Sequence, residues 1–177
     1  FKIKKILSKI HQFQPKTFYC DCSYQGKIPD LNSCGYTPYK NTNRANRIEW
    51  EHIVPASEFG KNIIAWKSGD PSCKTKSGHK FSGRRCARSV SKEFRVMEAD
   101  LYNLVPAIGE INQRRSNLPY SDKYLNVSGC QTRVLSKYIV PRKQIRGMIA
   151  RAYLYMHAAY PGFNIINNNN RVMFTRW

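Results

Sequence analysis

One short stretch of the chain places three ionisable side chains among apolar ones. Residues 47–55 read Arg-Ile-Glu-Trp-Glu-His-Ile-Val-Pro, so Glu49, Glu51 and His52 lie among residues typical of a half-buried strand. Such groups are costly to bury without partners, which indicates a chemical or structural reason for their presence. A histidine beside a carboxylate suits a general base next to a metal ion. A salt-bridged strand edge with one surface histidine would fit the same residues.

Hydrolysis of a nucleic-acid phosphodiester needs a base for water, cations for the phosphate and the leaving group, and a basic groove. His52 suits the base because an unperturbed imidazole titrates near neutral pH. Glu51 offers a carboxylate to Mg²⁺ and Asn112 a neutral carbonyl oxygen, which suffice because bound Mg²⁺ keeps several waters. Arg84 or Arg85 can hold a phosphate bidentately.

The order of Glu51 and His52 raises a geometric difficulty. Neighbouring residues of a regular strand point to opposite faces. The two side chains share one site only if the strand ends or bulges there, or if the metal lies around the strand edge. Pro55 favours an early end to the strand, because proline cannot donate to a sheet ladder.

The composition favours a polyanionic partner. The 177 residues fit one domain, residues 1–177, and 41% of them are apolar, enough for a real core. Lys and Arg number 30 against 11 Asp and Glu, a net charge of +19, which favours nucleic acid, anionic lipid or acidic polysaccharide. No apolar run approaches the ~18 residues of a membrane span, so we expect no membrane insertion. The basic, apolar start at residues 1–7 indicates a mature N-terminus from which any signal peptide is absent.

Six cysteines in a small basic chain indicate disulfides and an oxidising compartment. They are Cys20, Cys22, Cys34, Cys73, Cys86 and Cys130. A zinc site is disfavoured, because only one residue separates the first two cysteines and no second close pair completes four ligands. Many pairings are open. The local candidates are Cys22 with Cys34 and Cys73 with Cys86, which would leave Cys20 with Cys130.

Hydrophobic spacing and turn residues predict a mixed, helix-rich α+β domain. The first half is predicted to contain an amphipathic helix over residues 1–13, a disulfide-stapled irregular region over 17–40, a strand over 44–54, a short helix capped by Ser57 over 56–66, and a pinned basic loop over 67–92. The second half is predicted to contain a helix over 92–104 whose apolar line continues to a break or restart at Pro106, a helix near 112–115, short β pieces within 119–140, a helix over 142–160, and a polar loop with an apolar tail over 163–177.

Three motifs resemble the bacterial periplasmic or secreted endonuclease I family. They are Arg-Ile-Glu-Trp-Glu-His-Ile-Val-Pro-Ala at 47–56, Met-Glu-Ala-Asp-Leu-Tyr-Asn-Leu at 97–104 and Pro-Ala-Ile-Gly-Glu-Ile-Asn at 106–112, with further similarity at 18–22, 33–36 and 146–153. The family belongs to the ββα-metal, or His-Me finger, nucleases. These enzymes cleave DNA and RNA with little sequence preference and usually leave 5′-phosphates. The resemblance therefore implies a ββα-metal core.

The resemblance also implies a role for each site residue. His52 would be the general base, Glu51 and Asn112 the ligands of Mg²⁺, and Glu98 an acidic active-site partner. Ca²⁺ or Mn²⁺ would occupy the same metal site. The family places an arginine before the position of Cys86, but this segment is one residue shorter here, so Arg84 is the first choice and Arg85 the second. Tyr102 stands where the family has histidine. The expected nucleic-acid contacts come from Arg84, Arg85, Arg88, Arg114 and Arg115.

The sequence therefore predicts a Mg²⁺-dependent, sequence-tolerant endonuclease acting on DNA and RNA. We expect a periplasmic or secreted monomer. A metal-free ribonuclease with two catalytic histidines would suit the charge and the disulfides equally well. A cationic protein that only binds nucleic acid or membrane surfaces would explain the charge but not Glu51, His52 and Asn112.

Overall fold

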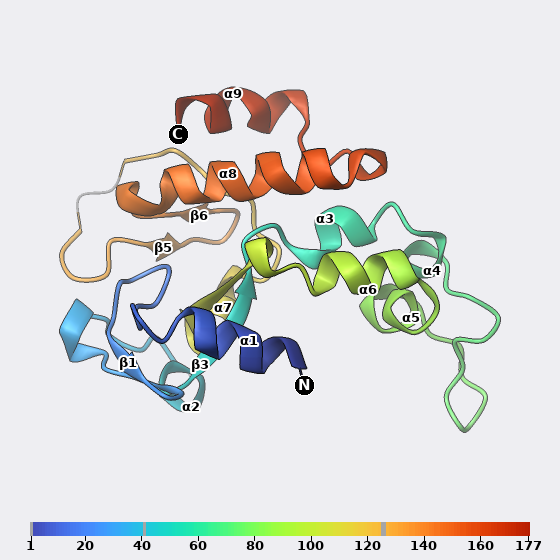
Figure 1. Ribbon diagram of the computed structural model, residues 1–177, viewed down its shortest axis with the longest axis horizontal. Coiled ribbons are helices and arrows are strands. Elements are labelled where there is room, and N and C mark those ends of the chain that lie inside the picture. Colours follow the sequence, from blue (N-terminus) through green and yellow to red (C-terminus); the bar gives the residue numbers. More distant parts are fainter. Residues whose placement is uncertain (1, 41, 125–126) are drawn as a thin grey trace.

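Two antiparallel strands at the centre of the molecule carry the residues singled out above. The computed structural model describes residues 2–40, 42–124 and 127–177, and in it β3 (Ile48–His52) pairs with β4 (Leu104–Ile108). The register places Ile48 opposite Ile108 and His52 opposite Leu104. The helix α7 (Gly109–Arg115) follows β4 directly and packs against both strands (Figure 1). The expected strand over 44–54 is thus shorter, because α2 (Thr42–Ala45) precedes it.

The strand β4 begins where we expected the end of a helix. The helix predicted over 92–104 ends early as α6 (Lys92–Glu98), and η2 (Leu101–Asn103), a 3₁₀ turn, leads into β4. Pro106 therefore lies within a strand and not at a helix break. The carbonyl of Pro106 accepts from the amide of Phe18, so the backbone groups of Pro106 point away from β3. The missing N–H of proline costs no ladder bond on that side.

A group of short helices lies beside the central pair (Figure 1). Besides α6, it contains α3 (Ala56–Gly60), α4 (Ile64–Lys67) and α5 (Gly83–Val90). The single helix expected over 56–66 is therefore two, and Pro55, not Ser57, holds the N-cap position. The prediction of a loop over residues 67–92 is wrong in its second half, which forms α5 and carries Arg84, Arg85 and Arg88.

The remaining elements surround this centre. In the first part of the chain they are α1 (Lys2–Ile10), β1 (Tyr24–Gln25), β2 (Ile28–Pro29) and the 3₁₀ turn η1 (Asn32–Cys34). In the last part they are β5 (Arg133–Val134), β6 (Ile139–Val140), α8 (Lys143–Ala159), the 3₁₀ turn η3 (Pro161–Phe163) and α9 (Asn168–Arg176). The pieces expected within 119–140 and the helix over 142–160 are confirmed. The helix α9 was missed, although Asn167 and Asn170 form a capping box at its start.

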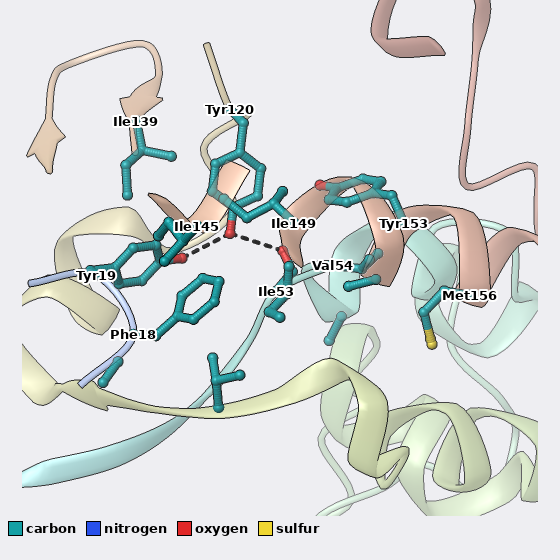
Figure 2. Close-up of a cluster of buried hydrophobic side chains, with 14 of the residues drawn as sticks. Phe18, Tyr19, Ile53, Val54, Tyr120, Ile139, Ile145, Ile149, Tyr153 and Met156 are labelled. Carbon is teal, nitrogen blue, oxygen red and sulfur yellow. Dashed lines mark hydrogen bonds between the residues drawn. The ribbon is translucent and has the colours of Figure 1, made fainter. Parts of the chain in front are cut away.

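The core forms where α8 lies over the end of β3 (Figure 2). The buried face of α8 presents Ile145, Ile149, Tyr153 and Met156. Ile53, which follows β3, packs in the same cluster. Because α8 is the longest described helix and buries one whole face, it provides the support on which β3 and the segments around it are held.

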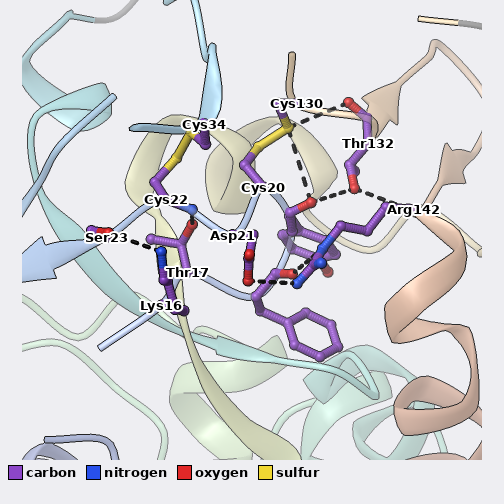
Figure 3. Close-up of polar contacts among 12 residues, drawn as sticks. Lys16, Thr17, Cys20, Asp21, Cys22, Ser23, Cys34, Cys130, Thr132 and Arg142 are labelled. Atoms are coloured by element: carbon purple, nitrogen blue, oxygen red, sulfur yellow. Dashed lines mark hydrogen bonds and ion pairs between the residues drawn. A yellow bond between two sulfur atoms is a disulfide. The ribbon is translucent and has the colours of Figure 1, made fainter. Parts of the chain in front are cut away.

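All six cysteines are paired, which confirms the expected disulfides. Cys20 bonds Cys130, Cys22 bonds Cys34 and Cys73 bonds Cys86 (Figure 3 draws the first two). The first joins segments 110 residues apart, whereas the third ties the loop before α5 to that helix over 13 residues. Among the described residues, no helix is long and apolar enough to cross a membrane.

We predict that the two disulfides Cys20–Cys130 and Cys73–Cys86 differ in their effect on stability. In the chain-entropy description, a bridge across a separation of 13 contributes about 3 kcal/mol and one across 110 about 5 kcal/mol. Urea unfolding of the two double Cys→Ala variants measures both values. An equal loss in the two variants would contradict this ranking.

Candidate active site

His52 is held by a backbone carbonyl. Its Nε2 lies 2.8 Å from the carbonyl oxygen of Glu98, the last residue of α6. A carbonyl oxygen only accepts, so Nε2 must carry the hydrogen of this bond. In a neutral imidazole the other nitrogen, Nδ1, then has a free lone pair. This is the tautomer that a general base requires.

The surroundings of His52 keep its ring neutral. Burial lowers the pKa of His52 to about 4; the bond to the Glu98 carbonyl acts in the opposite direction, and the positive charge of Arg84 lowers the pKa further. The imidazole is therefore uncharged at neutral pH and able to accept a proton.

Two exposed arginines lie beside this histidine. Glu98 accepts from Arg84 at 2.5 Å and from Arg88 at 2.6 Å, both on α5. Partial burial opposes charge on Glu98, but the hydrogen bonds from Arg88 and Arg84 outweigh it and lower the pKa of this carboxyl. Arg85 is placed differently, with its guanidinium 4.2 Å from the ring centre of Phe81. The structure therefore groups Arg84 and Arg88, and not Arg85, with Glu98 and His52.

Glu51 leaves β3 in another direction, into the interior. Its Oε1 accepts from the hydroxyl of Tyr19 at 2.9 Å and from Nη1 of Arg115 at 3.1 Å. The Tyr19 hydroxyl also contacts that of Tyr120 at 2.9 Å, and Tyr120 donates to the carbonyl of Ile53 (Figure 2). Burial raises the pKa of the Glu51 carboxyl, while Arg115 and Tyr19 act in the opposite direction.

The position of Arg115 corrects one expectation. Its side chain is 1% exposed and donates to the carbonyls of His52 and Ile53 as well as to Glu51. A guanidinium enclosed in this way cannot reach the phosphates of a nucleic acid, so its role is internal. Arg114 is half-buried, lies 4.3 Å from the ring centre of Tyr39 and donates to a backbone carbonyl.

Asn112 faces the same side of β3 as Glu51. Its Nδ2 donates to Oε2 of Glu49 at 3.1 Å, and Arg47 and Arg44 also pair with this carboxylate. The contacts of Glu49 with Asn112 and of Glu51 with Arg115 form two successive rungs between β3 and α7. Since Nδ2 is engaged with Glu49, the carbonyl oxygen of Asn112 is left for another partner.

The residues around His52 and those around Glu51 meet at the end of β3. Glu51 turns to α7 and His52 to α6, as expected for neighbours on an extended strand. His52 is also the last residue of β3, so the strand ends two residues before the end expected at residue 54. Arg115 links the groups, because it binds both the carboxylate of Glu51 and the carbonyl of His52.

The oxygen donors present fit a hydrated Mg²⁺ ion. The two side chains that donate to the Glu51 carboxylate within the described residues, Tyr19 and Arg115, both bond Oε1 and not Oε2, and the backbone of His52 also acts on this carboxylate. Those residues contain no group of three or more His, Cys, Asp or Glu side chains suited to a metal. An ion at Glu51 and Asn112 would therefore keep most of its waters, which Mg²⁺ does readily.

The sequence did not identify the partners that hold Glu51. Tyr19 precedes Cys20 and Tyr120 lies in a turn region, and neither position has a spacing that indicates a site. The only signal was the carboxylate itself, because a buried Glu51 requires donors from elsewhere in the chain.

We predict that Arg115 and Arg114 contribute very differently to stability. Arg115→Ala leaves Glu51 buried without its cation, which costs about 3–5 kcal/mol. Arg114→Ala is the matched control and costs about 1–2 kcal/mol, because it removes a contact with the Tyr39 ring and hydrogen bonds to the Val134 carbonyl and Tyr36 but not the cation of the Glu51 pair. Urea unfolding of both variants tests this. Similar values for the two would show that the buried pair does not support the fold.

We also predict a pH dependence from His52, measured without added metal. The unfolded state takes up a proton near pH 6.5 and the folded state only near pH 4, so the contribution is complete above 6.5. It is lost as the pH falls from 6.5 to 4 and reaches at most about 3 kcal/mol. NMR titration of the ring gives the folded pKa, and unfolding experiments over this range give the slope. The slope should become shallower in His52→Gln and keep only the part due to other groups such as His11, whose pKa burial also lowers; an unchanged slope would exclude His52 as its source.

Comparison with known proteins assigns the family. The family model described as Endonuclease I matches residues 3–176. An extracellular deoxyribonuclease of Aeromonas hydrophila is 43% identical over 185 residues, covering 98% of this chain and 74% of that protein. Endonuclease-1 of Buchnera aphidicola subsp. Acyrthosiphon pisum is 42% identical over 187 residues, covering 100% and 68%. An extracellular endonuclease of Pseudomonas fluorescens biotype A is 30% identical over 177 residues, covering 98% and 72%. The chain therefore belongs to the endonuclease I family and is a nuclease.

Proposed function

We propose that this nuclease is a Mg²⁺-dependent, sequence-nonspecific endonuclease of DNA and RNA with His52 as its general base. The observation that carries the proposal is the bond from His52 Nε2 to the carbonyl of Glu98, 2.8 Å long. It leaves Nδ1 unprotonated, and the side chain of the same Glu98 pairs with Arg84 and Arg88, two exposed cations that suit a phosphate. The central strands β3 and β4 followed by α7 are consistent with a ββα-metal core.

The proposed reaction is hydrolysis that leaves a 5′-phosphate. Water attacks phosphorus, the bond from phosphorus to O3′ breaks, Nδ1 of His52 takes a proton of the attacking water, and the leaving O3′ takes a proton from solvent water to become a 3′-hydroxyl. Arg84 and Arg88 stabilise the negative charge that develops on the phosphate oxygens. Glu51 Oε2 and Asn112 Oδ1 would hold Mg²⁺, or Ca²⁺ or Mn²⁺ in its place, which supplies further positive charge to the phosphate and the leaving oxygen when bound.

Binding is proposed to rest on phosphate contacts and not on base sequence. The net charge of +19 favours any polyanion, and the exposed Arg84, Arg85 and Arg88 share one helix. Relatives named extracellular and periplasmic deoxyribonuclease support DNA as a substrate and a secreted or periplasmic location. Three disulfides agree with an oxidising compartment. We propose that the chain acts there as a monomer.

The metal-free ribonuclease receives less support. That mechanism pairs a histidine base with a histidine acid. Within the described residues, the recorded partners of the His52 ring are a carbonyl and nearby charged groups, and His11 instead lies 5.6 Å from the ring centre of Trp50.

We predict that His52→Ala and Asn112→Ala impair the enzyme in different ways. His52→Ala removes the base and lowers the single-turnover rate by about 10²–10⁴-fold, while Mg²⁺ affinity stays within about 2-fold. Asn112→Ala removes a neutral ligand and weakens Mg²⁺ binding, so excess Mg²⁺ restores part of its rate. Asn112 is used because replacing Glu51 would also strand the buried Arg115.

The measurements are plasmid cleavage in Mg²⁺ or EDTA, and calorimetric titration with Mg²⁺. His79→Ala, in the exposed loop before α5, is the control and should resemble the unmodified chain. Near-normal cleavage by His52→Ala would exclude it as the base. Normal Mg²⁺ affinity in Asn112→Ala would place the metal elsewhere, and DNA cleavage in EDTA would exclude the metal mechanism.

A further inference from the structure

An open groove lies between α1, η2, β4 and α8, next to the candidate active site. It has a volume of about 810 Å³, and we call it the tyrosine groove. The lining residues used below are His11, Tyr102, Leu104, Met148, Arg151 and Tyr155. Several apolar side chains in it face solvent: Ile10 is 52% exposed and Met148 44%. A nuclease has no need of exposed apolar surface for phosphate contacts alone, so the groove requires another explanation.

The two tyrosines of the groove form a pre-organised aromatic surface. The rings of Tyr102 and Tyr155 lie 4.6 Å apart between centres, and Tyr102 is 73% exposed. Asp100 holds both residues: its Oδ1 accepts from the amide of Tyr102 at 2.9 Å and its Oδ2 from the hydroxyl of Tyr155 at 3.1 Å. Tyr160 also donates to this carboxylate, at 2.7 Å. Asp100 thus fixes the backbone at Tyr102 and the Tyr155 side chain against which the Tyr102 ring lies, before any ligand binds.

The charges around the groove suit an anionic ligand. Arg151 lies in the lining and is exposed, and the salt bridges recorded among the described residues do not include it. The helix α1, which ends at the groove with Ile10, carries Lys4, Lys5 and Lys9 on its exposed side. A ligand that combines a flat apolar surface with negative charge is therefore favoured over a purely apolar one.

The lining of the tyrosine groove includes direct neighbours of His52. Leu104, in the groove lining, is the strand partner of His52, and Ile53, also in the lining, is the next residue after it. Asp100, which holds the tyrosines, follows two residues after Glu98, whose carbonyl binds His52. A strand whose phosphate lies at His52 would therefore pass beside the groove.

We propose that the tyrosine groove binds an unpaired nucleobase adjacent to the scissile phosphate, stacked on Tyr102, with a neighbouring phosphate at Arg151. This inference rests on the proposed nuclease function and names the form of the substrate. A base within a duplex is covered on both faces by its neighbours, so only a single-stranded, frayed or flipped base can use the ring. The groove therefore favours single strands and locally opened duplexes without reading their sequence, since every base has a face that stacks.

The test measures binding and not cleavage. In the His52→Ala background, fluorescence anisotropy gives the affinity for a short oligothymidine, for an abasic strand of equal length and charge, and for a duplex, in Mg²⁺ and in EDTA. Tyr102→Ala should weaken oligothymidine binding by about 5- to 100-fold and leave the abasic strand and the duplex within about 2-fold. Tyr102→Phe keeps the ring and should bind oligothymidine like the parent.

Tyr124→Ala is the matched control, because Tyr124 is 68% exposed and lies 5.0 Å from a lysine but outside the groove. It should change none of the affinities, and thermal unfolding should show all variants folded. Equal losses on the abasic strand, or no loss with Tyr102→Ala, would overturn the proposal. Sedimentation showing a dimer that Tyr102→Ala dissociates would also overturn it, by assigning the groove to a second copy. Because the test measures binding and not cleavage, its result would still decide the base-stacking proposal even if the proposed nuclease mechanism were wrong.

Discussion

The buried ion pair of Glu51 and Arg115 is the constraint on which the candidate site depends. A carboxylate and a guanidinium in the interior are stable only if most of their other hydrogen-bonding positions are filled. Here Tyr19 fills one position on Glu51, and the carbonyls of His52 and Ile53 fill positions on Arg115, whose Nε is left without a partner among the described residues. The pair therefore ties α7 to the end of β3 and sets the backbone path on either side of His52.

This constraint extends to the disulfides. The carbonyl of Tyr19 accepts from the hydroxyl of Thr132 at 2.6 Å, and the Cys20–Cys130 bridge joins the same two segments (Figure 3). The position of the Tyr19 hydroxyl against Glu51 is thereby determined by a covalent bond on one side and the core under α8 on the other. In an oxidising compartment such a bridge persists, so the partner of Glu51 is held without cost at the moment of catalysis.

Much of the site could be predicted from local sequence, but its contacts could not. The placement of His52, Asn112 and Arg84 on a strand, a helix and a cysteine-tied segment follows from motifs a few residues long. The difference between Arg114 and Arg115 does not follow from such motifs. The two are adjacent residues of the same type, and only the packing of α7 on β3 determines which of them is buried. In the fold, Pro106 suggests a helix break because sequence alone does not show that its backbone nitrogen faces away from β3, where no ladder bond is lost. The helix α9 was missed because a run of asparagines indicates a loop unless their capping geometry is known.

The few acidic residues of this basic chain position several of its arginine side chains. Glu98 orients Arg84 and Arg88, Glu49 holds Arg44 and Arg47, and Glu51 holds Arg115; Asp100 holds tyrosines instead. Each of the three glutamates is thus paired with arginine at the site, where a free carboxylate would repel a phosphate. Pairing also restricts the long arginine side chains, so that Arg84 and Arg88 would meet a phosphate with less loss of conformational entropy than free arginines. The excess of positive charge attracts any polyanion, whereas under the proposed mechanism these few carboxylates would give the phosphate a defined position beside His52.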